Sequence, residues 1–181
     1  MKFIPTDLAG AFVVELERHT DERGFFASTW CANELAEHGL TARFVQGNVS
    51  YNHAAGTMRG MHWQAEPHGE DKLVRVTAGA VWDVLVDLRP DSPTRGEHVG
   101  LRLDATNRTA VYIPKGMAHG FLTLEDATEV VYEMSAFYVP EAARGARWDD
   151  PAFAIDWPAE VRVISDRDAG YPDYQPGPPG P

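Results

Sequence analysis

Two short motifs carry side chains that could transfer protons or bind a metal ion. In RGMHWQ, residues 59–64, His62 and Gln64 stand two positions apart in an apolar segment and would share one face of a strand. In PKGMAHGF, residues 114–121, His119 follows a turn-like stretch. A histidine can serve as a general base near neutral pH or as a metal ligand, and the two roles require different neighbours.

The neighbours of the histidines disfavour a metal. PKGMAHGF matches the second motif of cupin barrels, Pro-x-Gly-x-x-His, and RGMHWQ stands where the first motif would supply His-x-His and a glutamate. Gln64 replaces the second histidine, so His62 and His119 are left without a placed carboxylate. Catalytic metal centres typically have three protein ligands. We therefore expect no metal site, and a metal-dependent cupin is kept as an alternative that metal analysis would detect.

Two more polar side chains belong to apolar strands. Lys72 directly precedes the run LVRV, and Tyr132 shares its face with Val130 and Met134. Taken singly, each has an ordinary structural role, as a solvated charge beside Glu70 or as a packed tyrosine with a hydrogen-bonded hydroxyl. Only together with the two histidines do they indicate a specific site.

Strands must position these side chains, because most of the chain consists of short β-rich runs with Gly, Pro, Asn and Asp between them. Short helices are expected in residues 29–40, where Gly39 would end the helix, and in residues 140–148. The pattern predicts an all-β fold, a jelly-roll barrel of the double-stranded β-helix type with a few short peripheral helices. The main predicted strands lie within residues 71–90 on either side of TAGA, and in 97–103, 109–114, 119–124 and 128–138.

Composition limits the classes of partner and the domain count. A chain of 181 residues suits one domain, predicted for residues 1–172, with a Pro/Gly-rich tail at 173–181. The net charge of −11 disfavours nucleic acid and anionic membranes as partners. The single cysteine, Cys31, rules out an intramolecular disulfide. Since no signal peptide or membrane span is evident, we expect a cytoplasmic protein.

The order of motifs between residues 21 and 168 resembles that of the RmlC family, the dTDP-4-dehydrorhamnose 3,5-epimerases. The resemblance implies a cupin fold and a cofactor-free isomerase that inverts C3 and/or C5 of a nucleotide-diphospho-4-keto-6-deoxyhexose. The matching stretches are DERGFF (21–26), QGNVSYN (46–52), GTMRGMHWQ (56–64), KLVRVTAGAVWDVLVDLRPDSPT (72–94), YIPKGMAHGFLTL (112–124), VYEMSAFYVPE (131–141), RWDDP (147–151) and ISDRD (164–168).

The resemblance implies four catalytic residues. His62 would be the general base and Asp168 the carboxylate that pairs with it. Lys72 would hold the C4 ketone oxygen, and Tyr132 would return a proton on the opposite face of the sugar. This set fits the chemistry, because both α-carbons of a 4-keto sugar are carbon acids. Inversion then needs a base, an acid and a group that stabilises the enolate, but no hydride carrier or metal.

The resemblance also implies binding residues. Arg23 and Arg59 would hold the diphosphate, for which the guanidinium fork is well suited. Arg59 and His62 are three positions apart and would face opposite sides of a regular strand. Either Gly60 bulges the strand, or Arg59 precedes it, or the two side chains serve separate parts of the site. Further implied site residues are Gln46, Asn48, His119, Tyr138 and Arg167, the last in place of the usual lysine.

Departures from the family pattern concern the nucleobase. His19 stands where the family often has a phenylalanine that stacks on thymine, and Ser28 where it often has a glutamate. An acidic residue common in the family is also replaced near Ala143. A CDP- or GDP-linked ketosugar therefore stays open as the substrate beside a dTDP-linked one.

The implied assembly is a homodimer in which the N-terminal segment reaches the partner's site, so that Arg23 would act in trans. Alternatives are a 3- or 5-mono-epimerase, a ketoisomerase, and a sugar-binding cupin without catalysis. The intact Lys72 and Tyr132 argue against a ketoisomerase, and the complete set of four catalytic residues argues against a silent binding module.

Overall fold

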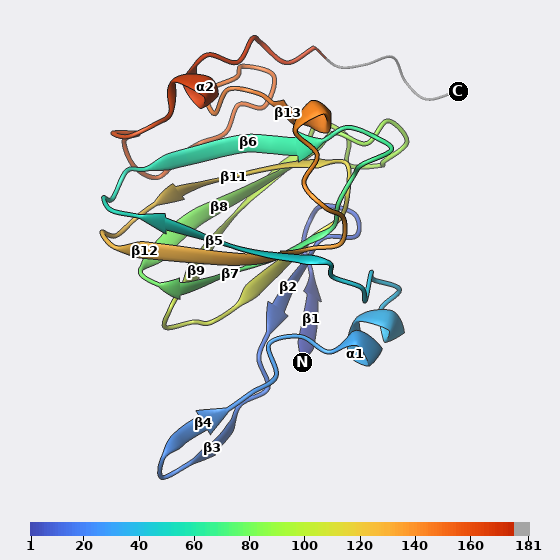
Figure 1. Cartoon of the computed structure of the whole chain (residues 1–181), viewed down its shortest axis with the longest axis vertical. Helices are drawn as coiled ribbons and strands as arrows, with labels where there is room; N and C mark the ends of the chain where they lie inside the picture. Colours follow the sequence, from blue (N-terminus) through green and yellow to red (C-terminus); the bar gives the residue numbers. More distant parts are fainter. Residues whose placement is uncertain (176–181) are drawn as a thin grey trace.

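The computed structural model describes residues 1–175, which form two facing β-sheets, short helices and a projecting hairpin (Figure 1). The six-stranded sheet has the order β1 (Lys2–Pro5), β2 (Phe12–Glu15), β10 (Ala110–Ile113), β7 (Lys72–Ala78), β12 (Thr128–Met134), β5 (Gln46–Asn52). The five-stranded sheet has the order β13 (Ala143–Gly145), β6 (Met58–Gln64), β11 (Met117–Thr123), β8 (Ala80–Asp87), β9 (His98–Asp104). Outside the sheets are the hairpin β3 (His19–Asp21) and β4 (Gly24–Phe26), the helices α1 (Ala32–Glu37) and α2 (Asp166–Ala169), and the 3₁₀ turn η1 (Pro140–Ala142).

A single apolar core joins the two sheets. Val74 of β7 and Val130 of β12 pack against Leu85 of β8 and Phe121 of β11. Because side chains alternate along a strand, the opposite face of β8 is free to pack elsewhere, and it does so beneath the segment after β13. The named strands pair antiparallel, and the predicted jelly-roll barrel is confirmed.

The two predicted helices have different outcomes. The first forms as α1, and Gly39, with φ of +70°, follows its end. The prediction of a helix over residues 140–148 is wrong beyond the 3₁₀ turn, because Ala143–Gly145 form β13 and pair with β6. Pairing with the open edge of β6 outweighs the local helical preference, which is worth only a fraction of a kcal/mol per residue.

The hairpin β3–β4 projects away from the barrel (Figure 1). Its residues are exposed, including Phe26 at 72%. Phe25 lies against two cations, with the guanidinium carbons of Arg18 and Arg108 at 5.1 and 5.2 Å from its ring centroid. The barrel therefore carries a protruding arm that the single chain leaves largely uncovered.

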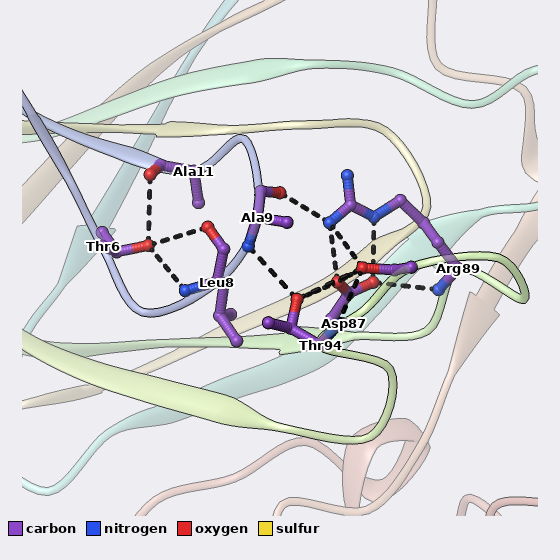
Figure 2. A network of polar contacts seen from close by, with 8 residues as sticks. Thr6, Leu8, Ala9, Ala11, Asp87, Arg89 and Thr94 are labelled. Carbon is purple, nitrogen blue, oxygen red and sulfur yellow. Dashed lines mark hydrogen bonds and ion pairs between the residues drawn. The ribbon is translucent and has the colours of Figure 1, made fainter.

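A buried carboxylate ties the N-terminal loop to the end of β8 (Figure 2). Both oxygens of Asp87 accept hydrogen bonds from the Arg89 guanidinium, at 2.9 and 2.6 Å, and Thr94 donates to the same group. Arg89 also donates to the carbonyl oxygen of Ala9. The network joins segments that no strand pairing connects directly.

The domain boundary stays a prediction. Tyr174 packs against Phe153 and Trp63, and its backbone N–H donates to Asp150. The remaining part of the predicted tail, 176–181, lies outside the described residues. Within residues 1–175, no helix is long and apolar enough to cross a membrane, and the cytoplasmic location stays a prediction from the sequence.

Candidate active site

A cavity of about 410 Å³ lies between the two sheets. Its walls come from β5, β6, β7, β11 and β12, from the segment around β13, and from α2. The cavity brings together most of the residues predicted from the sequence, namely Arg59, His62, Lys72, His119, Tyr132, Tyr138, Arg167 and Asp168.

His62 and Asp168 form a hydrogen-bonded pair, with 2.7 Å between Nε2 and Oδ1. Asp168 lies in α2, which Ser165 caps by accepting from the Asp168 backbone N–H. The second oxygen, Oδ2, accepts the N–H of Gly60 at 3.2 Å. Burial alone would raise the pKa of Asp168, but the His62 hydrogen bond and charge and the Gly60 N–H together hold that pKa below its usual value. The buried carboxylate is therefore ionised at neutral pH and fixes the imidazole.

A bulge in β6 allows Arg59 and His62 to reach the same cavity. His62 pairs with His119 and Arg59 with Phe121, so β6 has one residue more than β11 in this interval. Gly60 has φ of +120°, and a Cβ there would meet the backbone of Gly120 at 2.5 Å. Of the three arrangements that the sequence left open, the bulge at Gly60 is the one that occurs.

Lys72 and Tyr132 come from neighbouring strands of the other sheet. In the register of β7 and β12, Lys72 pairs with Met134 and Tyr132 with Val74, so both side chains face the cavity. The Lys72 ammonium lies 2.6 Å from Glu70, and both side chains are at least 90% buried. Burial raises the pKa of Tyr132 above its usual value, so its phenol keeps its proton at neutral pH.

His119 belongs to a second imidazole–carboxylate pair. Its Nε2 lies 2.8 Å from Oδ2 of Asp83, whose side chain is fully buried in β8. His119 and His62 are cross-strand neighbours on β11 and β6. The cavity wall therefore presents two imidazoles, each held by its own carboxylate.

Two sets of contacts lie beside the cavity, one around Arg167 of α2 and one around Gln46 of β5. Arg167 donates to the Tyr171 hydroxyl at 2.8 Å and also interacts with Tyr138. Gln46 accepts the backbone N–H of Tyr138 at 3.0 Å and donates to Asn48. Gln46 and Asn48 do not line the cavity, and Gln46 holds the backbone of Tyr138, which does.

Three of the predicted site residues lie away from this cavity within the single chain. His19 and Arg23 belong to the projecting hairpin, and Ser28 follows it, all three exposed. Arg23 pairs instead with Asp21 of the same hairpin. Within the described chain, this arm supplies no side chain to the cavity wall.

Gln64 takes part in the site as a structural support. Its amide nitrogen donates to the carbonyl oxygens of His68 and Phe137, and its Oε1 accepts the N–H of Val139. The side chain thereby fastens two loops beside the cavity. Among residues 1–175, no group of three or more His, Cys, Asp or Glu side chains is placed to hold a metal ion.

The sequence analysis missed two charged residues of the cavity wall. Arg144 lies in the segment wrongly predicted as helix, which forms β13 instead. Glu70 was treated as a neighbour of a surface charge, yet it is buried. Since Glu70 stands two positions before Lys72, the alternation of a strand could have placed both on one face.

The fold and the cavity define a cupin-type barrel whose cavity wall gathers ionisable side chains from both sheets. The chain belongs to the family described as dTDP-4-dehydrorhamnose 3,5-epimerase, which it matches over residues 5–175. It is 47% identical over 174 residues to the dTDP-4-dehydrorhamnose 3,5-epimerase of Methanothermobacter thermautotrophicus, which covers 94% of this chain and 92% of the relative. The resemblance seen in the sequence is confirmed.

Two solved structures extend the comparison to ligands. One is a dTDP-6-deoxy-D-glucose-3,5-epimerase from Legionella pneumophila in complex with dTDP-4-keto-L-rhamnose, with a TM-score of 0.87, 38% identity, and coverage of 96% of this chain and 98% of that one. The other is ChmJ, a 3′-monoepimerase from Streptomyces bikiniensis in complex with dTDP-quinovose. Its TM-score is 0.86, with 33% identity and coverage of 93% of this chain and 86% of that chain.

Proposed function

We propose that this chain inverts C3 and C5 of a dTDP-linked 4-keto-6-deoxyhexose in the cavity between its sheets. The observation that carries the proposal is the His62–Asp168 pair, which faces the same cavity as Lys72 and Tyr132. Family membership and the dTDP-linked ketosugar in the Legionella relative support the substrate class.

His62 is the base of the proposed reaction. Asp168 accepts a hydrogen bond from Nε2–H, which leaves the lone pair of Nδ1 free to take a proton from the carbon next to the ketone. The C–H electrons move into the C–C bond, and the carbonyl electrons move onto the ketone oxygen. The Lys72 ammonium stabilises the negative charge of the resulting enolate oxygen. Because Lys72 is buried, this electrostatic interaction is stronger than it would be in water.

Tyr132 returns the proton. Its phenol is protonated at neutral pH and comes from the sheet opposite to that of His62. Delivery of a proton from that side gives the inverted centre, and solvent restores the original protonation states of both residues. The same scheme operates once at C3 and once at C5, and it uses neither a hydride carrier nor a metal ion.

The diphosphate end of the substrate needs cations in a chain of negative net charge. Arg59 and Arg167 line the cavity and supply guanidinium groups on two sides of it. Arg59 is held by Asn52, which accepts from its Nε at 2.7 Å. A positioned guanidinium can pair with two phosphate oxygens at once.

We also propose that the active form is a homodimer. The outer edge of β5 pairs with no named strand, and its Val49 and Tyr51 are 62% and 49% exposed. On β7, which β12 separates from β5, Nη1 of Arg75 is buried without a hydrogen-bond partner in the described part of the chain. An apolar open edge of this kind favours pairing with a second copy, which would also give the projecting hairpin a surface to contact.

Proton NMR in D2O tests the proposed activity. With dTDP-4-keto-6-deoxy-D-glucose and no added metal, we expect deuterium to enter both C3 and C5 and the double-inverted product to appear. Exchange at C3 alone would make the chain a mono-epimerase, as ChmJ is described. If the dTDP substrate does not exchange but a CDP- or GDP-linked ketosugar does, the nucleotide of the substrate is CDP or GDP rather than dTDP. No exchange with any of them would refute the function.

A further inference from the structure

Lys72 has a buried anionic partner. Its Nζ lies 2.6 Å from Oε1 of Glu70, with side-chain exposures of 10% and 4%. The other oxygen of Glu70, Oε2, is also buried and makes no hydrogen bond with the described residues. Because no other donor compensates this carboxylate, its charge acts mainly on the ammonium beside it.

Asp71 fixes the backbone that carries Glu70. It alternates with Glu70 and Lys72 and points to the other side of the chain. Its carboxylate accepts hydrogen bonds from Thr41, from Ser135 and from the backbone N–H of Lys115. Three separate segments thus hold this turn, so the Glu70 carboxylate has a defined position at the start of β7.

The Glu70 charge also reaches Tyr132. Burial is the main reason for the raised pKa of the Tyr132 phenol, nearby Arg59 opposes it, and Glu70 adds to it. The remaining ionisable groups around the cavity are Tyr51, His62, Arg59, His119 backed by Asp83, Tyr138, Arg144, Arg167 and Asp168. Among the ion pairs of residues 1–175, the partner of Lys72 is Glu70.

We propose that Glu70 is a positioning residue of the reaction, which holds the Lys72 ammonium at the ketone oxygen and adds a negative charge to the wall that carries the Tyr132 phenol. This inference rests on the proposed epimerisation. Glu70 touches neither the sugar nor the reacting atoms. It supplies the negative charge that a buried ammonium needs, and it opposes the ionisation of a phenol in the same wall.

The Glu70→Gln variant tests this role through the pH dependence of the reaction. Loss of the carboxylate removes a negative charge that opposes ionisation of the Tyr132 phenol, so this phenol ionises more easily and activity ends at lower pH. We expect the alkaline limb of kcat to move to lower pH. The maximum rate should drop by about 10–100-fold, less than the loss of an oxyanion donor itself. Binding of dTDP, followed by titration calorimetry, should change by less than about twofold, since Arg59 and Arg167 are untouched.

Two further variants make the outcome decisive. Glu70→Asp keeps the charge but shortens the side chain, so its alkaline limb should stay in place while its maximum rate falls. Glu66→Gln is the matched control, because Glu66 is 65% exposed and its one ion pair within residues 1–175 is with Lys115 at 3.6 Å. Glu66→Gln should have no effect on either quantity.

The results separate this inference from the proposed function. Suppose that the wild-type protein exchanges deuterium. If the alkaline limb of kcat does not move in Glu70→Gln, or if it moves in Glu70→Asp, the proposed role of Glu70 is wrong, whereas the proposed epimerisation stands. If Glu70→Gln does not fold, as judged by its thermal melting, Glu70→Asp decides alone. If the wild-type protein exchanges no proton at any pH, the proposed function fails, and this inference fails with it.

Discussion

The roles proposed for His62 and Tyr132 differ in the direction in which each residue would move a proton. Asp168 stays ionised through its hydrogen bonds, and its carboxylate holds one ring nitrogen of His62, which leaves the other nitrogen to face the cavity. The phenol of Tyr132 is buried, and burial favours its neutral form. A base and an acid are thereby present in one cavity at one pH.

Variants at these two residues should separate the two proton transfers. His62→Ala should lower deuterium exchange at both carbons by about 10²–10⁴-fold, because the base is lost. Tyr132→Phe should lower net inversion much more than exchange, because abstraction by His62 continues and reprotonation returns the starting sugar. Exchange and product are read from the same NMR samples. Full inversion by Tyr132→Phe would refute the assignment of the acid.

Elements hold the site through contacts that are local in space but distant in sequence. Period-two alternation was sufficient to predict the central strands and to place Tyr132 on one face with Val130 and Met134, whereas the role of Lys72 came from the family resemblance. The bulge at Gly60 was one of three alternatives, since a bulge depends on the partner strand β11 as well as on the glycine. The helix predicted near Ala143 failed for the same reason, because the edge of β6 that pairs with it lies far away in the sequence.

The pairing of His62 with Asp168 shows the same limit. The two residues are separated by 106 positions, and no spacing rule connects them. Only the family resemblance placed them together. Glu70 was missed because its neighbours Asp71 and Lys72 suggested a solvated charge cluster, whereas burial is decided by the opposite sheet and the Ser135 segment.

The Asp87 network should make stability depend on pH at the low end. Its hydrogen bonds with Arg89, Ser92 and Thr94 outweigh burial and lower the pKa of Asp87 to about 2 from 3.8. A lowered pKa contributes stability above the unfolded-state value, and that contribution, about 2 kcal/mol, is lost as the pH falls from about 4 through 2. Urea unfolding between pH 7 and 2 should detect this loss in the wild-type protein.

Removal of the Asp87 carboxylate should lower stability at pH 7 and weaken the dependence of stability on pH. Asp87→Asn leaves Arg89 without its ionic partner and should cost about 3 kcal/mol at pH 7, the low end for a broken buried pair, because Arg89 is partly exposed. Its stability should then change less between pH 4 and 2. Glu15→Gln, which breaks the exposed pair with Lys2, serves as the control and should cost less than about 0.5 kcal/mol. Equal effects of the two variants would refute the network's role.

At the scale of the whole molecule, the cavity and the projecting hairpin are two separate parts of the described chain. The cavity collects the four proposed catalytic residues from one barrel, whereas the hairpin β3–β4 projects from it with Arg23 exposed (Figure 1). The open edge of β5, with Val49 and Tyr51, lies on the same barrel. A closed dimer would cover that edge and let each arm contact the other barrel.

Mixed dimers test whether Arg23 acts in trans. Arg23→Ala and His62→Ala chains, each weakly active alone, would be co-expressed with different tags and purified as mixed dimers. If the arm serves the partner's site, the His62→Ala chain supplies an intact Arg23 to the barrel that has His62. One site of the two is then complete, and activity should return to about half of the wild-type rate per dimer. Mixed dimers of His62→Ala with Lys72→Met are the control, since both changes fall within one barrel wall and no complete site can form. If mixed dimers of Arg23→Ala with His62→Ala stay as inactive as this control, Arg23 does not act in trans. The arm then serves its own chain's cavity or has no part in the site.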